Sequence, residues 1–422
     1  MSRKAALLLP GLAILLLASS VGAAARPVGA TRADFSTDQG VAAYLNAKGL
    51  NAKGFVIQRG QFNYAGPKCP GKKWNCTKKT KVVQVTSGKH GKNRSDCGPG
   101  GTLTTTTGSS SCVIVQNASS GKNQARCSLD ARGVTPIVLT CQITQTNADG
   151  DNIARIHEHV VQRDGAVQQA TLNAQVTQTT GTGDNDSDVK QSIDQRSTQV
   201  SMTTSPNQNQ EGRFSAIIAQ TSTSGSNVSH LLQDLDQSGK ASGSSSLVQR
   251  QFGEGLGNVD QTIGTATPES VPTTSKNKGK HKGKPKSNSG SFSRSRARQS
   301  EHQRLKGPGQ QIQIGPFSCC STQVGGDPDH TRVRIKQNSK QSASQDTASQ
   351  SQSLTGTCTT VGDCGIRQHA QNDEDSIRVR QRCTAPEGGT CSLDVVTTCG
   401  PEGCSSGGGG SEGSKVKSRK RH

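Results

Sequence analysis

The chain has 422 residues, of which only 29% are hydrophobic and 2% aromatic, and its formal net charge is +20. So few apolar side chains cannot offset roughly 1–2 kcal/mol of backbone entropy per ordered residue across one large globular core. The composition therefore excludes such a core and predicts that disulfides and backbone pairing supply the order. The positive charge favours acidic partners or surfaces.

Residues 1–25 have the pattern of a secretory signal peptide. Arg3 and Lys4 give its positive start, an apolar run follows, and small residues around Ala23 offer a cleavage site. The apolar run is too short to span a bilayer. The sequence therefore predicts a secreted, extracellular or cell-surface protein that has no transmembrane segment after signal removal.

Residues 26–105 are predicted to form a cysteine-containing N-terminal cap. A short helix is expected from Asp38 to Lys48. The scarce aromatic residues gather near Trp74, where they favour a small packed core, with a ligand platform as the alternative.

The cysteines that follow the signal predict disulfides in an oxidising compartment. They form an early and a late group, each of even number, which favours two separately stapled modules. The groups are Cys69, Cys76, Cys97, Cys112, Cys127 and Cys141, then Cys319, Cys320, Cys358, Cys364, Cys383, Cys391, Cys399 and Cys404.

Residues 106–263 contain a Gln/Asn/Thr-rich repeat whose copies begin at Cys112, Cys141, Ala174 and Ala216. The copies share the form Cys/Ala-x-Ile/Val-x-Gln-x4-Gly-x-Asn-x-Ala/Ser. Period-two alternation on both sides of the glycine indicates strands joined by a loop, in which glycine permits positive φ. The repeated positions expected to shape the fold are Ile114, Gln116, Gly121, Asn123, Ile143, Gln145, Gly150, Asn152, Val176, Gln178, Gly183, Asn185, Ile218, Gln220, Gly225 and Asn227.

Folding one copy as a hairpin places Gln116 opposite Asn123 and Cys112 opposite Cys127. We therefore predict a cross-strand Cys112–Cys127 disulfide and an all-β fold, a disulfide-stapled antiparallel β-meander of hairpin repeats. A β-solenoid of stacked rungs is the rival architecture. Its rungs should have constant length, whereas the copies are unequally spaced, so the sequence favours the meander.

Residues 264–310 are predicted to be a basic disordered linker, because they are rich in Ser, Thr, Gly and Lys. The alternatives for it are polyanion binding and a solvated spacer. A second small Cys-rich β module is expected over 311–404, and a disordered Gly/Ser-rich basic tail over 405–422. The candidate polyanion-binding residues are Lys276, Lys278, Lys280, Lys282, Lys284, Lys286, Arg294, Arg296 and Arg298.

The sequence lacks the motifs of common catalytic sites, such as the Gly-x-Ser-x-Gly nucleophile elbow and the Gly-x4-Gly-Lys-Ser/Thr phosphate loop. His157 and His159 alternate on a strand but have no evident third zinc ligand. The segment Asp184–Asp188 lacks the glycine and the closing glutamate of a calcium loop. We therefore expect no catalytic residues, no metal site, no cofactor and no small-molecule substrate.

The repeat resembles the curlin-type strand–loop–strand units of bacterial extracellular fibres. Gln145, Gly150, Asn152, Ala154 and their equivalents in the other copies carry the resemblance. In that family, Gln and Asn ladders stack rung on rung into an amyloid fibre of the biofilm matrix that serves adhesion. The resemblance implies a surface or matrix role and self-association.

The function expected from these features is that of a secreted or cell-surface structural or adhesive repeat protein without catalytic activity. One alternative is a curli-like extracellular matrix fibre subunit, assembled through exposed edge strands. The other is a binding module that holds anionic cell-surface polymers or glycans through the basic linker.

Overall fold

The computed structural model describes residues 34–419 except 87, 89, 99–107, 134–135, 201–206, 243–247, 265–290, 309, 328–329, 345–347, 373–377, 386–388, 401–402 and 411–414. The signal peptide expected at 1–25 and the lysines from Lys276 to Lys286 lie outside the described residues. The described chain is all-β apart from one helix and contains disulfides, which confirms that part of the prediction. Within it, no helix is both long enough and apolar enough to cross a membrane.

The chain divides into two units, residues 1–52 and 53–422. The first unit contains the expected helix as α1 (Asp38–Ala47). Thr37 caps its start, because the Thr37 hydroxyl accepts a hydrogen bond from the backbone N–H of Gly40 at 3.0 Å.

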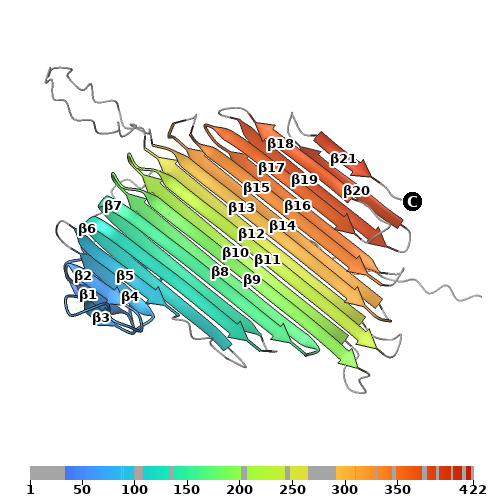
Figure 1. The fold of residues 1–422 in the computed structure, drawn as a ribbon, viewed down its shortest axis with the longest axis horizontal. Coiled ribbons are helices and arrows are strands. Elements are labelled where there is room, and N and C mark those ends of the chain that lie inside the picture. Colours follow the sequence, from blue (N-terminus) through green and yellow to red (C-terminus); the bar gives the residue numbers. More distant parts are fainter. Residues whose placement is uncertain are drawn as a thin grey trace, which may run out of the picture. The chain divides into compact units, whose positions relative to one another are not determined.

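The second unit is a β-solenoid, in which each rung consists of an opening strand, a bend and a closing strand (Figure 1). The opening strands are β1 (Val56–Arg59), β4 (Lys81–Thr86), the first parts of β6 (Gly108–Arg132) and β7 (Ile137–Arg163), β8 (Val167–Thr180), β10 (Asn207–Ser222), β12 (Val248–Ile263), β14 (Gln310–Val324) and β16 (Ser349–Thr359). The closing strands are β2 (Phe62–Ala65), β5 (Gly91–Cys97), the second parts of β6 and β7, β9 (Asn185–Val200), β11 (Asn227–Ser242), β13 (Ser293–Lys306), β15 (Arg332–Ala343) and β17 (Asp363–Asn372). Each set pairs in parallel from rung to rung, and β3 (Asn75–Thr77) adds to β2.

The stack reverses direction at its C-terminal end. Strand β18 (Arg378–Ala385) pairs antiparallel with β17, and β19 (Thr390–Gly400) pairs antiparallel with β16. Strands β20 (Gly403–Gly410) and β21 (Lys415–Arg419) then add antiparallel to β19 and β18. The prediction of a disordered tail over 405–422 is therefore wrong for the parts that form β20 and β21.

The antiparallel meander is also wrong, and the rival solenoid is the observed architecture. Gln116 lies beside Gln145, and Asn123 beside Asn152, in parallel register. The backbone hydrogen bonds of each copy run to neighbouring rungs, while its opening and closing strands turn side chains toward each other. The unequal spacing of the copies is absorbed between rungs: residues 164–166 join β7 to β8, whereas β9 ends at Val200 and β10 begins at Asn207.

The predicted linker and the division into two modules need correction as well. Residues 293–306, expected to be disordered, form β13 between β11 and β15, because alternating small and polar residues point inward and arginines point outward. Strands β12 and β14 pair across the boundary expected between the repeat domain and the C-terminal module. Both cysteine groups therefore belong to one continuous stack.

The interior of the stack alternates apolar and amide side chains. One register column consists of buried β-branched residues on the opening strands, and the closing strands carry small buried residues at the corresponding repeat positions. Period-two alternation thus points one side of every strand inward and leaves the other side to solvent. The column members are Ile114, Ile143, Val176, Ile218 and Val259, and the small residues are Ala125, Ala154, Ser187 and Ser229.

Candidate functional site

The repeat glutamines form a continuous ladder inside the solenoid. The Nε2 of each glutamine donates to the Oε1 of the glutamine one rung earlier, at 2.6–2.8 Å. A second N–H donates to a backbone carbonyl of the facing strand, as Gln116 does to Gln124 at 3.0 Å and Gln145 to Ile153 at 2.9 Å. The ladder satisfies buried amides that would otherwise cost about 1–3 kcal/mol each. Its members are Gln58, Gln84, Gln116, Gln145, Gln178, Gln220, Gln261 and Gln323.

The repeat asparagines form a second ladder, with the opposite polarity. Each Nδ2 donates at 2.9 Å to the Oδ1 of the asparagine one rung later. Each also donates to a backbone carbonyl of the facing strand in the next rung, for example Asn152 to Thr179 at 2.9 Å. The sequence named Asn123, Asn152, Asn185 and Asn227 as repeat positions, but it paired each of them with a glutamine of the same copy. The ladder consists of Asn63, Asn93, Asn123, Asn152, Asn185 and Asn227.

Further ladders were missed by the sequence reasoning, although their glutamines sit at alternate strand positions. They have the same donor direction as the first glutamine ladder, with distances of 2.7–3.0 Å. Their rows are Glu158–Gln191–Gln233–Gln299–Gln337–Gln368, Gln162–Gln195–Gln237–Gln303–Gln341, Gln168–Gln210–Gln251–Gln313–Gln350 and Gln208–Gln249–Gln311.

The repeat glycines stack on one another at the bends. A Cβ on Gly150, Gly183 or Gly225 would collide with the backbone carbonyl of the glycine one rung earlier. Of the four repeat glycines, only Gly121 and Gly150 have positive φ, so this backbone conformation does not explain why glycine recurs at Gly183 and Gly225. Close approach of neighbouring rungs is the requirement that the later copies share.

The predicted Cys112–Cys127 disulfide is wrong. Cys112 is bonded to Cys97, and Cys127 to Cys141, so each bridge joins adjacent rungs. The Sγ atoms of Cys97, Cys112 and Cys127 all lie within 4.8 Å of one another, which is why facing positions suggested the other pairing. Because these sulfurs are in disulfides, they are not available as metal ligands. The structure also has bridges Cys69–Cys76, Cys358–Cys364 and Cys399–Cys404.

Two carboxyl groups of the described residues lie inside the stack. Burial raises the pKa of Glu158 to about 8, against the opposing hydrogen bonds from Gln191 and the backbone of Cys141. Burial also raises the pKa of Glu301 to about 8, although the Ser339 hydroxyl donates to it at 2.5 Å. The carboxyl of Glu301 occupies the space left by Gly315, where a Cβ would clash with it. These groups are held neutral by desolvation around neutral pH.

The other candidate ligands do not converge. His157 is exposed, its ring lies 6.3 Å from that of His159, and His159 lies 3.5 Å from Asp130. In the segment tested as a calcium loop, Asp186 pairs with Arg155 and Asp188 with Lys190. These contacts are those of solvent-facing strand residues.

The two outer faces of the stack differ in chemistry. The first face is the outward side of the opening strands together with β19, and all the exposed large hydrophobic residues of the described chain lie on it: Val138, Val167, Ile217, Leu256, Ile314, Val324 and Val396. The second face is the outward side of the closing strands. On its early rungs, opposite charges compensate each other, as in the ion pairs Arg155–Asp186 and Arg163–Asp194.

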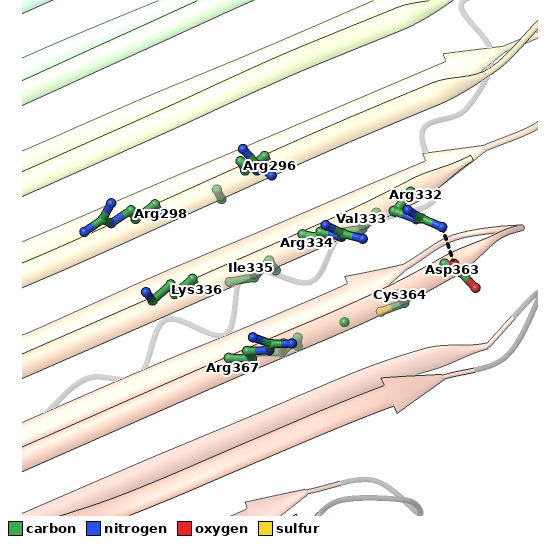
Figure 2. Close-up of a pocket in the computed structure, with 13 residues that line it drawn as sticks. Arg296, Arg298, Arg332, Val333, Arg334, Ile335, Lys336, Asp363, Cys364 and Arg367 are labelled. Atoms are coloured by element: carbon green, nitrogen blue, oxygen red, sulfur yellow. Dashed lines mark hydrogen bonds and ion pairs between the residues drawn. The ribbon is translucent and has the colours of Figure 1, made fainter. Parts of the chain in front are cut away.

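The second face becomes strongly basic on β13, β15 and β17. We define the basic array as Arg294, Arg296, Arg298, Arg332, Arg334, Lys336 and Arg367. Figure 2 shows most of these cations side by side on neighbouring strands. They line a hollow of about 500 Å³. Parallel register aligns Arg296 with Arg334, and Arg298 with Lys336 and Arg367. Arg332 pairs with Asp363 at 3.0 Å.

The sequence predicted only part of this array. It named Arg294, Arg296 and Arg298 but placed them in a disordered segment. The cations of β15 and β17 were missed, although Val333-Arg-Ile335-Lys shows the strand alternation that points its cations outward. These cations become neighbours only because strands that are distant in the sequence pair with one another.

Comparisons with protein-family models, with curated proteins and with solved structures find no match to this chain.

Proposed function

We propose that this chain is an exported, non-catalytic structural and adhesive protein. The observation that carries the proposal is the division of the stack into an interior of buried amide ladders and two outer faces of different chemistry. Side chains in the interior hold the rungs together and are buried, so only side chains on the outer faces can contact other molecules. A long, rigid display of side chains suits attachment to an extended surface.

The cysteines support an extracellular location for this function. Disulfides between adjacent rungs, such as Cys97–Cys112, persist in oxidising compartments. The signal pattern in residues 1–25 supplies the route of export. The curlin-type resemblance points to the same setting, because in-register Gln and Asn ladders are what that family uses in the extracellular matrix.

A matrix fibre made by end-to-end addition is the second candidate, favoured by the ladders themselves. The reversed strands β18 and β19 weigh against it at the C-terminal end. Gln341, Gln350 and Gln368 are the last members of their ladders. Their Oε1 atoms have no hydrogen-bond partner, and because they are buried they are not accessible to a second copy of the chain. We therefore favour a monomer or small assembly over a fibre. Thioflavin binding together with a meridional reflection near 4.7 Å from purified protein would reverse this choice.

Adhesion is tested with beads that carry the purified chain. The beads flow over surfaces coated with an acidic polysaccharide, a neutral polysaccharide or an apolar polymer, and albumin-coated beads serve as the control. We expect at least tenfold more attachment than albumin gives on one or more of these surfaces. Attachment equal to that of albumin on all of them would overturn the proposal.

A further inference from the structure

We propose that the basic array binds a linear acidic polysaccharide that carries a carboxylate on each sugar and lies along the stack. The inference rests on the adhesive function proposed above and deepens it, because it names the partner of the second face. Its support comes from the order of the cations, the absence of ion pairs at five of them in the described part of the chain, and the hollow beside Gly365.

The strands set the spacing of the cations. Register pairs Arg298 with Lys336, and Lys336 with Arg367, so these residues form a column across neighbouring strands. Hydrogen-bonded strands lie about 4.8 Å apart, which is close to the length of one pyranose unit along a polysaccharide. A chain laid along the column therefore brings its carboxylates within reach of cations on neighbouring strands.

Most of the basic array lacks compensating charge, although Arg332 pairs with Asp363. In the described part of the chain, no ion pair involves Arg296, Arg298, Arg334, Lys336 or Arg367, in contrast to the paired cations of the early rungs. Like charges on adjacent strands repel each other. An anionic polymer relieves that repulsion, and each arginine can offer a carboxylate two parallel N–H donors.

Gly365 leaves an open space within the basic array. Strand β17 places it beside Arg334. A Cβ built on Gly365 meets no atom within 4 Å, so the space above it is open. Arg296, Arg334 and Arg367 are among the residues that line this hollow (Figure 2). A carboxylate seated above the glycine would have cations on neighbouring strands within reach.

The placement of other side chains favours a polysaccharide over a nucleic acid or a lipid surface. The basic array itself contains no aromatic ring on which bases could stack, and Phe292 at its edge packs against Arg294 at 4.7 Å. Elements that lie on membranes present apolar side chains beside their cations. Here the exposed large hydrophobic residues lie on the first face instead.

The test measures binding of the full mature chain to polygalacturonate by calorimetry. Methyl-esterified polygalacturonate, which has the same backbone without charge, should bind at least tenfold more weakly. The triple variant Arg298→Gln/Lys336→Gln/Arg367→Gln should weaken binding to polygalacturonate at least tenfold. Circular dichroism of the variant verifies that the strands are retained.

A matched variant removes the same number of cations from ion-paired positions of the second face. Arg155→Gln/Arg163→Gln/Arg196→Gln should change affinity less than twofold, because each of these cations is already held in an ion pair with Asp186 or Asp194. Gly365→Gln fills the hollow without changing charge and should weaken binding at least threefold. Equal losses in the two triple variants, or an unchanged affinity in Gly365→Gln, would overturn the proposal.

Two further arms decide the partner class and the location. Tighter binding of single-stranded DNA or of phosphatidylserine vesicles, at equal concentration of charge, would overturn the assignment to a polysaccharide. Replacing the lysines from Lys276 to Lys286 with glutamine should change the affinity for polygalacturonate less than twofold. A tenfold loss of affinity would show that the binding site lies in that segment and not in the basic array. If these tests fail while beads still attach to neutral or apolar surfaces, the adhesive function stands and this inference alone falls.

Discussion

Gln191 donates a hydrogen bond from its Nε2 to Oε2 of Glu158 at 2.8 Å, so a carboxyl group begins a ladder whose other members are amides. The carboxyl group of Glu158 is fully buried. A carboxyl group in this place is compatible with the interior only while it is neutral. Glu158 and Glu301 therefore couple the stability of the solenoid to pH.

The sign of this coupling follows from the raised pKa values. The ordinary pKa of a glutamate side chain is 4.5, and in the folded chain the pKa of each group is about 8. Between these two pH values the unfolded chain loses the proton of each group while the folded chain keeps it. The contribution of these two groups to stability is therefore highest below pH 4.5, falls as pH rises to 8 and is flat above it. The loss is on the order of 5 kcal/mol for each group. Urea unfolding measured from pH 4 to pH 9 checks this trend.

The variant Glu158→Gln separates this effect from other titrations. Glutamine accepts the same hydrogen bond from Gln191 and does not ionise, so we expect the variant to be more stable than the native chain at pH 8 and similar to it at pH 4. Asp184→Asn, at an exposed position, is the control and should follow the native profile. A native pH profile in Glu158→Gln would contradict the assignment.

Strand positions could be predicted from the sequence, whereas strand partners could not. Alternation around Ile114 and Gln116 indicates which side points inward, and this is the same in a hairpin and in a stacked arch. The choice between them depends on the amides. A buried glutamine has two donors and an acceptor to satisfy, and an in-register copy above and below provides for them. The basic array could not be predicted for a related reason: Arg298 and Arg367 become neighbours only through that stacking.

The glutamine ladder is expected to be essential to stability. Gln220→Leu keeps the volume but leaves Gln178 without its donor and Gln261 without its acceptor. We expect a loss of about 1–3 kcal/mol for each buried group left unpaired. Gln175→Leu, at an exposed position on the neighbouring strand, should change the free energy of unfolding by less than about 0.5 kcal/mol. Similar urea midpoints for the two variants would contradict the role of the ladder.

The glycine column is expected to tolerate no side chain. Gly183→Ala brings a methyl group against the backbone of Gly150, which forces the rungs apart. We expect a loss of about 1–3 kcal/mol, as is usual for overpacking. Gly400→Ala is the matched control, because a Cβ there meets no atom within 4 Å. Thermal unfolding of both variants decides the point, and equal melting temperatures would argue against close packing at the bends.

The disulfide register can be tested by tryptic mapping without reduction. Trypsin cleaves after Arg94, Lys122, Arg126, Arg132 and Arg155, so Cys97 and Cys112 fall in one peptide, 95–122. The solenoid predicts an internal bridge in this peptide and a separate bridge that joins peptide 127–132 to peptide 133–155. A hairpin with Cys112 bonded to Cys127 would instead join 95–122 to 127–132. Recovering the hairpin product would contradict these two bridges between adjacent rungs.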